Sequence, residues 1–108
     1  MGPVSDPQPP GTTRMAFFFL MDDGPERVRE VAPRHAAYWH GMAPPEYLGG
    51  PFADRTGGLI TFKAATAGQA EQLVSDDPFL REGLLGSWWL EQWIPEGAAP
   101  TMSPAGQP

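Results

Sequence analysis

The residue whose type best suits catalysis is a histidine that lies within an apolar helical pattern. Val28, Val31, Ala32 and Trp39 recur around His35 at the spacing of one helix face. One interpretation is a buried imidazole satisfied by a backbone carbonyl, because a buried polar group needs a hydrogen-bond partner. The other is a general acid or base, since histidine as a residue type changes charge near neutral pH. Taken alone, the helical pattern favours the structural interpretation.

Two aspartates precede a proline in the stretch "SDDPF", which ends a second helical pattern. A residue before proline is pushed out of the helical conformation, so we expect the helix to end near Asp77. Asp also favours the N-cap position, and Asp77 is placed to cap a short turn that begins at Pro78. We expect Asp76 to be the solvated member of the pair. These roles leave room for a second one, because a carboxylate fixed at a helix junction can orient an imidazole.

The other polar candidates give weaker indications. Ser87 is not surrounded by a Gly-x-Ser-x-Gly elbow, so we predict a hydrogen-bonding residue of a pocket and not a nucleophile. His40 lies off the apolar face and is expected at the surface. The glycine-rich stretch 49–58 lacks the Lys and Ser/Thr of a phosphate loop. Four carboxylates lack the spacing of metal ligands, and we predict no metal: Asp22, Asp23, Glu46 and Asp54.

Composition narrows the class of protein. The chain has 108 residues, the length of one domain, and a net charge of −6, which argues against a nucleic-acid partner. It has no cysteine, which excludes disulfides and thiolate sites and fits a cytoplasmic location. The longest apolar run, "MAFFFLM", is too short to cross a bilayer, and residues 1–13 lack the pattern of a secretory signal. We therefore expect no membrane partner.

The elements that must position His35 and Asp77 follow from changes of period along the chain. Residues 1–13 and 96–108 are rich in Pro and polar residues and are predicted to be flexible tails, which leaves 14–95 as the folded domain. Pro33 predicts a kink or a restart in the first helix. The predicted order is strand 15–21, helix 25–42, strand 46–52, strand 58–64, helix 66–77 and strand 84–94.

This β-α-β-β-α-β order predicts an α+β, ferredoxin-like fold, with an antiparallel sheet and both helices on one face. The other face of such a sheet is bare, so two copies can cover each other in a homodimer. On the last strand, Ser87 and Trp89 share the face expected to be open. Trp88, Leu90 and Ile94 are expected on the opposite face, in the core under the helices.

Several motifs, in order, resemble the YCII-related family of the dimeric α+β barrel superfamily. The segments that carry the resemblance are "RHAAYW", "YLGGPFADRTGGLITFKAAT" and "DDPFLREGLLGSWWLEQW". They supply the family's Pro-x-His-x-x-Tyr pattern at Pro33, His35 and Tyr38, and its Asp-Pro-Phe pattern at Asp77. The match is completed by the acidic turn at 22–25 and by the Gly-Pro sequence of Gly50 and Pro51, with Asp54 nearby. It covers residues 15–93.

The resemblance implies a His–Asp pair, His35 and Asp77, in a pocket between the sheet and the helices. It reverses the preference for a structural histidine and favours a catalytic one. One characterised type in this family removes chloride from a chlorinated hydroxyquinol, and more distant relatives isomerise lactones or cyclise aromatic polyketides. It therefore implies a cofactor-free lyase, isomerase or cyclase whose partners are a small-molecule substrate and a second copy.

The aromatic content favours a pocket for a flat, cyclic ligand such as a phenol or a polyketide. The alternatives are a non-catalytic binding or accessory domain with a structural His–Asp pair, and a dehydrohalogenase that acts on phenols. Trp89 departs from the family pattern, which usually has a polar residue there. The residues expected to bind substrate are Tyr38, Trp39, Phe17, Phe19, Ser87, Trp89 and Pro51.

Overall fold

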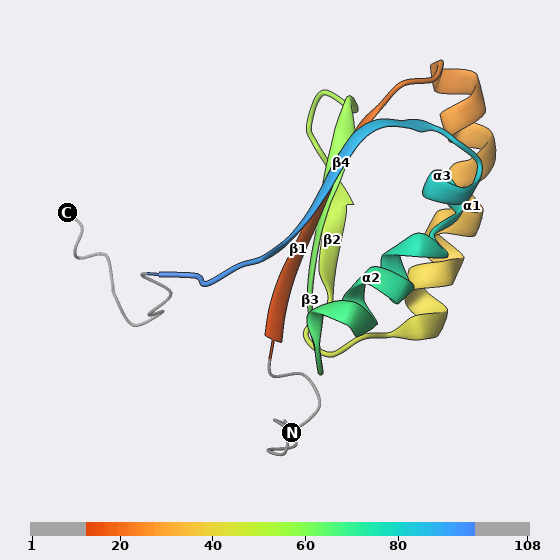
Figure 1. Cartoon of the computed structure of the whole chain (residues 1–108). Helices are drawn as coiled ribbons and strands as arrows, with labels where there is room; N and C mark the ends of the chain where they lie inside the picture. Colours follow the sequence, from red (N-terminus) through yellow and green to blue (C-terminus); the bar gives the residue numbers. More distant parts are fainter. Residues whose placement is uncertain (1–12, 97–108) are drawn as a thin grey trace.

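The computed structural model describes residues 13–96 and confirms the predicted α+β class and the order of the elements. A four-stranded antiparallel sheet, with strand order β2-β3-β1-β4, carries the helices on one side (Figure 1). The elements are β1 (Thr13–Met21), α1 (Pro25–Met42), β2 (Leu48–Pro51), β3 (Gly57–Ala64), α2 (Ala67–Ser75), α3 (Pro78–Arg81) and β4 (Leu85–Gln92). The tails predicted for 1–13 and 96–108 lie almost entirely outside the described residues.

The apolar run of β1 forms the centre of the sheet, paired with β3 on one side and β4 on the other. Phe17 and Phe19 are buried on the side that faces the helices, while Phe18 points to the open side. Ile60 and Phe62 of β3, two residues apart and therefore on one face of the strand, are also buried. The strands β1 and β3 are both hydrogen-bonded at two edges and packed beneath α2, a position that favours apolar sequence.

Helix α1 runs without interruption from Pro25 to Met42, so the predicted restart at Pro33 is wrong. Proline lacks an N–H and leaves the carbonyl of Arg29 without its helical donor. Both Pro33 and Arg29 lie on the exposed side of the helix, where water can satisfy that carbonyl. Pro25 occupies the first turn, where its missing N–H costs no hydrogen bond.

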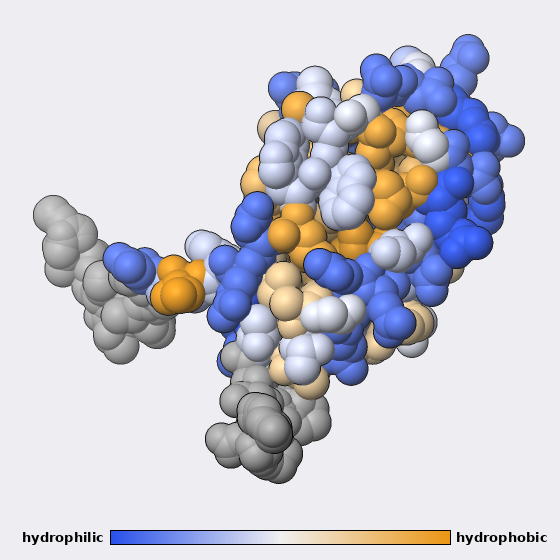
Figure 2. All heavy atoms as spheres, in the orientation of Figure 1, coloured by the Kyte–Doolittle hydropathy of each residue, from blue (hydrophilic) through white to orange (hydrophobic). Residues whose placement is uncertain are grey.

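The core lies between the sheet and the helices. Trp39 of α1 is fully buried against Phe17 and Phe62, with ring centroids 6.4 and 5.5 Å away. Figure 2 shows apolar residues gathered between the helices and the sheet, while the outer side of the helices is hydrophilic. None of the helices within residues 13–96 combines the length and the apolar character that crossing a membrane would require.

The edge strand β4 departs from one expectation. Trp88 shares the helix-facing side with Phe17, whose ring it meets edge-on at 6.1 Å. Trp88 is nevertheless 43% exposed and Ile94 is 74% exposed, so their predicted place in the core is wrong. The reason is position in the sheet: α2 packs on β1 and β3, whereas β4 lies at the edge beside β1.

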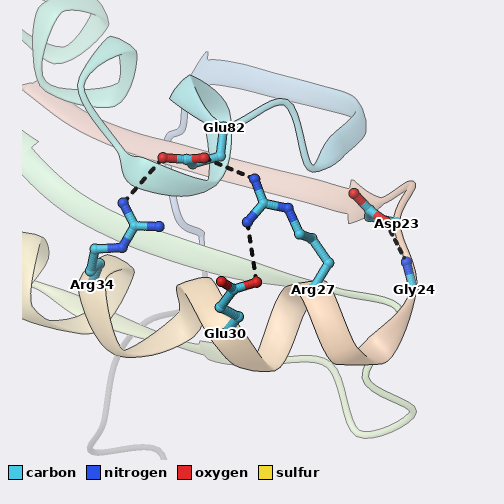
Figure 3. A network of polar contacts seen from close by, with 6 residues as sticks. All are labelled: Asp23, Gly24, Arg27, Glu30, Arg34 and Glu82. Carbon is cyan, nitrogen blue, oxygen red and sulfur yellow. Dashed lines mark hydrogen bonds and ion pairs between the residues drawn. The ribbon is translucent and has the colours of Figure 1, made fainter.

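Helix α3 is a short element between α2 and β4, and a network of ion pairs ties it to α1. Glu82, which follows α3, accepts hydrogen bonds from Arg27 (2.9 Å) and Arg34 (3.1 Å) of α1 (Figure 3). The two guanidinium groups hold the pKa of Glu82 below its usual range, chiefly through these hydrogen bonds. The network joins the end of α3 to the helix that carries His35.

Candidate active site

His35 and Asp77, on separate elements, meet in a hydrogen bond. Nδ1 of His35 lies 2.8 Å from Oδ1 of Asp77, across the junction between α1 and the start of α3. Asp77 is completely buried, and the His35 side chain is 17% exposed. In this geometry the buried carboxylate of Asp77 can orient the imidazole of His35, which keeps one edge accessible.

Asp77 is held by three donors. Oδ1 accepts from the backbone N–H of Phe79 at 2.8 Å as well as from His35, and Oδ2 accepts from Nε1 of Trp39 at 3.0 Å. The bond to Phe79 is the N-cap of α3, which the Asp-Pro sequence predicted. Trp39 follows His35 by one helical turn, so both side chains of α1 reach the same carboxylate. These bonds compensate for the burial of the charge.

The ring of His35 is fixed by aromatic neighbours. It stacks on Phe79 with centroids 4.2 Å apart and an interplanar angle of 19°, and it meets the edge of Phe19 at 6.0 Å. Because Asp77 accepts from Nδ1, Nε2 is the nitrogen left with a free lone pair. Nε2 makes no hydrogen bond to another residue within the described range, and the ring lines a cavity. His35 is therefore positioned to act as a base towards a molecule in that cavity.

The cavity lies between α1, the edge strand β2 and the tip of β3, and it measures about 410 Å³. This volume is within the range of small-molecule sites. Most of its wall is apolar, with Phe19 and Phe79 beside His35 and with Gly50 and Pro51 along β2. An apolar wall with few polar groups suits a compact ring compound better than a sugar or a phosphate chain.

Three polar residues of this wall were not predicted as site residues. His40, Tyr47 and Arg55 line the same cavity as His35. His40 was expected at the surface, and it is indeed exposed, at the mouth of the cavity. Tyr47 stacks on Trp39 at 5.9 Å, and burial together with the Asp77 charge raises the pKa of its phenol. Tyr47 and Arg55 reach the cavity only because the segments on either side of β2 approach α1. No local sequence pattern predicts this approach.

The structure separates the predicted substrate-binding residues into groups. Phe19 and Pro51 line the cavity. Phe17 and Trp39 are wholly buried behind it and expose no surface to a ligand there. Ser87 and Trp89 lie on the open face of the sheet, where Trp89 stacks on Phe18 at 5.0 Å. They do not reach the cavity, because β4 directs alternate side chains away from the helices.

Tyr38 also lies away from this cavity. Its hydroxyl donates to the carbonyl of Leu73 in α2 at 2.5 Å, and its ring lines a separate hollow that includes Met42 and Asp76. Burial, with smaller contributions from Asp76 and Asp77, raises the pKa of Tyr38 to about 12. The side chain therefore joins α1 to α2 as a neutral phenol.

The carboxylates considered as metal ligands serve other purposes. Asp23 accepts from the N–H of Gly24, and Asp54 accepts from the N–H and hydroxyl of Thr56, so both shape turns. Glu46 pairs with Arg14 and Lys63, and these pairs hold its pKa below the usual range. Across residues 13–96, no cluster of three or more His, Cys, Asp or Glu side chains is arranged to hold a metal ion.

A solved enzyme shares this fold. The chain resembles the 5-chloro-2-hydroxyhydroquinone dehydrochlorinase from Burkholderia phenoliruptrix, solved in complex with 2,5-dihydroxybenzoquinone, with a TM-score of 0.65 and 24% sequence identity. The match covers 75% of this chain and 93% of the dehydrochlorinase chain. No protein-family model and no curated protein sequence matches the chain. The likeness shows the shared fold alone, and membership of the dimeric α+β barrel superfamily and of its YCII-related family stays a prediction.

Proposed function

We propose that the protein is a small cofactor-independent enzyme in which His35 transfers protons on a cyclic, phenolic or quinone-like compound. The observation that carries the proposal is the hydrogen bond between His35 and the buried Asp77, with the imidazole in the wall of an apolar cavity. The fold shared with an enzyme that dechlorinates a hydroquinone supports this class of substrate.

The proposed mechanism uses Nε2 of His35 as the base. Nε2 takes a proton from a hydroxyl, or from a carbon next to a carbonyl, and the electron pair left behind moves into the ring. The buried carboxylate of Asp77 stabilises the imidazolium that forms. If the proton then returns to another atom of the substrate, the result is isomerisation. If the electron pair instead attacks a carbonyl carbon of the same molecule and the proton goes to the oxygen of that carbonyl, the new bond gives cyclisation. Alternatively, the electron pair expels a leaving group such as chloride, which gives elimination.

Hydrogen exchange in heavy water tests this mechanism before the full reaction is identified. Cyclic ketones, hydroxyquinones and chlorinated hydroquinones are incubated with the protein, and the loss of carbon-bound protons is followed by NMR and halide release by ion analysis. His35→Ala is expected to lower the exchange rate by about 100-fold or more, which is the size of a general-base contribution. A folded His35→Ala protein with unchanged exchange and halide release contradicts the proposal.

A non-catalytic binding domain is the second candidate, and one observation favours it. Asp77 caps α3 and anchors Trp39 besides contacting His35, so the carboxylate has a structural role of its own. This candidate predicts that His35→Ala binds ligands as the parent does and that neither protein accelerates exchange. The exchange experiment therefore separates the two candidates directly.

A homodimer is also part of the proposal. The open face of the sheet carries several exposed apolar side chains, and such a patch on a soluble protein indicates a partner: Leu20, Leu48, Leu59, Trp89 and Trp93. A second copy would present the same patch and cover it. Trp89→Glu is expected to shift the sedimentation coefficient to that of a monomer, whereas Met42→Glu, at an exposed apolar position on α1, is expected to leave the dimer intact.

A further inference from the structure

The charged groups around the cavity are unusual for this chain. The protein has 13 acidic and 7 basic residues, yet no Asp or Glu is among the described residues that line the cavity. His35, His40 and Arg55 supply all of its ionisable nitrogen groups, and Tyr47 adds a hydroxyl. A cavity wall that holds the positive charge of Arg55 and no carboxylate favours an anion over a neutral ligand.

Arg55 is the permanent cation in this wall. Four other arginines (14, 27, 34 and 81) form ion pairs with carboxylates, but Arg55 has no ion-pair partner within residues 13–96. Its neighbour Asp54 forms no ion pair with it in the described part of the chain, and one oxygen of Asp54 instead accepts both the N–H and the hydroxyl of Thr56. Arg55 also borders a neighbouring hollow whose described lining includes Asp23 and Asp54, and it forms an ion pair with neither of them. The guanidinium is therefore available to a ligand.

The backbone fixes where Arg55 begins. Arg55 has φ of 65°, in the left-handed region that costs energy for a residue other than glycine, and its N–H donates to the carbonyl of Phe52 at 2.9 Å. The turn that contains it leads into Gly57, which also lines the cavity. The turn thus holds the base of an arginine side chain at the rim of the cavity that His35 lines from α1.

The nearest buried carboxylate, Asp77, is not part of the cavity wall, although its charge reaches Tyr47 and, together with burial, raises the pKa of that phenol. Asp77 lies behind the imidazole, and its oxygens accept from His35, Trp39 and Phe79. Tyr47, whose pKa is raised by burial, remains a phenol and can donate a hydrogen bond to an anionic oxygen. Arg55 and Tyr47 therefore present donors to a ligand, whereas Nε2 of His35 presents a lone pair.

We propose that the cavity selects a small ring compound that is an anion at neutral pH, with its negative oxygen towards Arg55 and its reacting proton towards His35. The negative oxygen belongs to a carboxylate or to an acidic ring hydroxyl, both of which suit the planar fork of a guanidinium. The inference uses the cavity of the proposed function and adds the charge of the substrate. Removing a proton from an anion builds a second negative charge, which the positive charge of Arg55 stabilises.

Binding of unreactive probes tests the inference without any turnover. Para-hydroxybenzoate and para-hydroxybenzamide share a ring and a phenol and differ in the charge of one group, and 2,5-dihydroxybenzoquinone serves as an acidic ring hydroxyl. Isothermal titration calorimetry is run on the parent protein, Arg55→Gln and Arg29→Gln. Arg29 is the matched control, since it is also exposed, has no ion-pair partner in the described part of the chain and does not line this cavity.

The parent protein is expected to bind the benzoate about tenfold more tightly than the benzamide, the size of one charge-assisted contact. Arg55→Gln is expected to remove this preference, Arg55→Lys to restore part of it, and Arg29→Gln to keep it. Equal binding of the two probes by the parent, no binding of either anion, or equal loss in Arg29→Gln overturns the inference. None of these results depends on whether His35→Ala abolishes exchange, so the two proposals fail separately.

Discussion

Replacing Asp77 by asparagine tests whether one carboxylate joins α1 to α3. Asparagine keeps the shape and one acceptor oxygen but puts an NH₂ group where the second oxygen was. If the remaining oxygen keeps His35 and the N–H of Phe79, the NH₂ group faces Nε1–H of Trp39, and a buried donor loses its partner. If the asparagine amide is flipped, its NH₂ group faces both Nδ1 of His35 and the N–H of Phe79, and two donors lose their acceptor. The first orientation therefore gives the minimum loss of stability.

The size of the effect follows from these contacts. An orphaned buried donor costs about 1–3 kcal/mol. The two remaining bonds lose the charge of their acceptor, and each is weakened by about 0.5–1.5 kcal/mol, since hydrogen bonds to charged groups are worth about twice neutral ones. The free energy of unfolding is therefore expected to fall by about 2–6 kcal/mol. For a domain of this size the melting temperature falls by more than about 10 °C.

The neighbouring aspartate provides the control. Asp76 pairs with Arg81 at 2.8 Å, but both side chains are more than half exposed, so Asp76→Asn is expected to change stability by less than about 1 kcal/mol. Urea unfolding is followed by tryptophan fluorescence at one fixed protein concentration, because dimerisation would make stability depend on concentration. If Asp77→Asn unfolds at the same urea concentration as Asp76→Asn, the three hydrogen bonds of the Asp77 carboxylate do not stabilise the fold and the reasoning is refuted.

Two further perturbations follow from the packing. A Cβ at Gly57 would lie 1.9 Å from the carbonyl oxygen of Phe19, so Gly57→Ala is expected to lower the free energy of unfolding by about 2–3 kcal/mol in urea titrations. Gly50→Ala, where a Cβ meets nothing within 4 Å, should cost much less, and equal losses would contradict the packing argument. The pKa of Tyr38 is raised from 10.0 to about 12, so its neutral form stabilises the fold below pH 10 and this contribution is lost as the pH rises towards 12. Tyr38→Phe, which removes the hydroxyl that donates to Leu73, should flatten this alkaline decline in melting temperature, and an unchanged profile would exclude Tyr38 as its source.

The parts of the fold that the sequence predicted are those that depend on local pattern. The apolar run of β1 predicted a buried central strand, and the alternation in β3 and β4 predicted which face each side chain occupies, since the period of a strand is fixed. Asp77 as an N-cap followed from its place before Pro78. The exposure of Trp88 did not follow, because it depends on how far the helices extend over an edge strand.

The composition of the cavity could not be predicted for a similar reason. Tyr47 and Arg55 lie on the irregular segments around β2, and their position next to His35 is set by contacts between distant parts of the chain. Arg55 also adopts a backbone conformation that no sequence preference for arginine indicates. The face of α1 that carries His35 could be predicted, whereas the residues opposite that face could not.

The structural and the catalytic interpretation of Asp77 depend on the same arrangement, because one carboxylate both caps α3 and contacts His35. Pro78 ends the preceding helical conformation, and the N-cap bond to Phe79 fixes the carboxylate at the start of α3. Trp39 occupies the second oxygen, so the first oxygen is the one that faces His35. A residue that served only to cap α3 would need neither contact from α1. Because His35 and Trp39 are one helical turn apart and reach opposite oxygens of one buried carboxylate, their combination is stronger support for a positioned base than His35 alone.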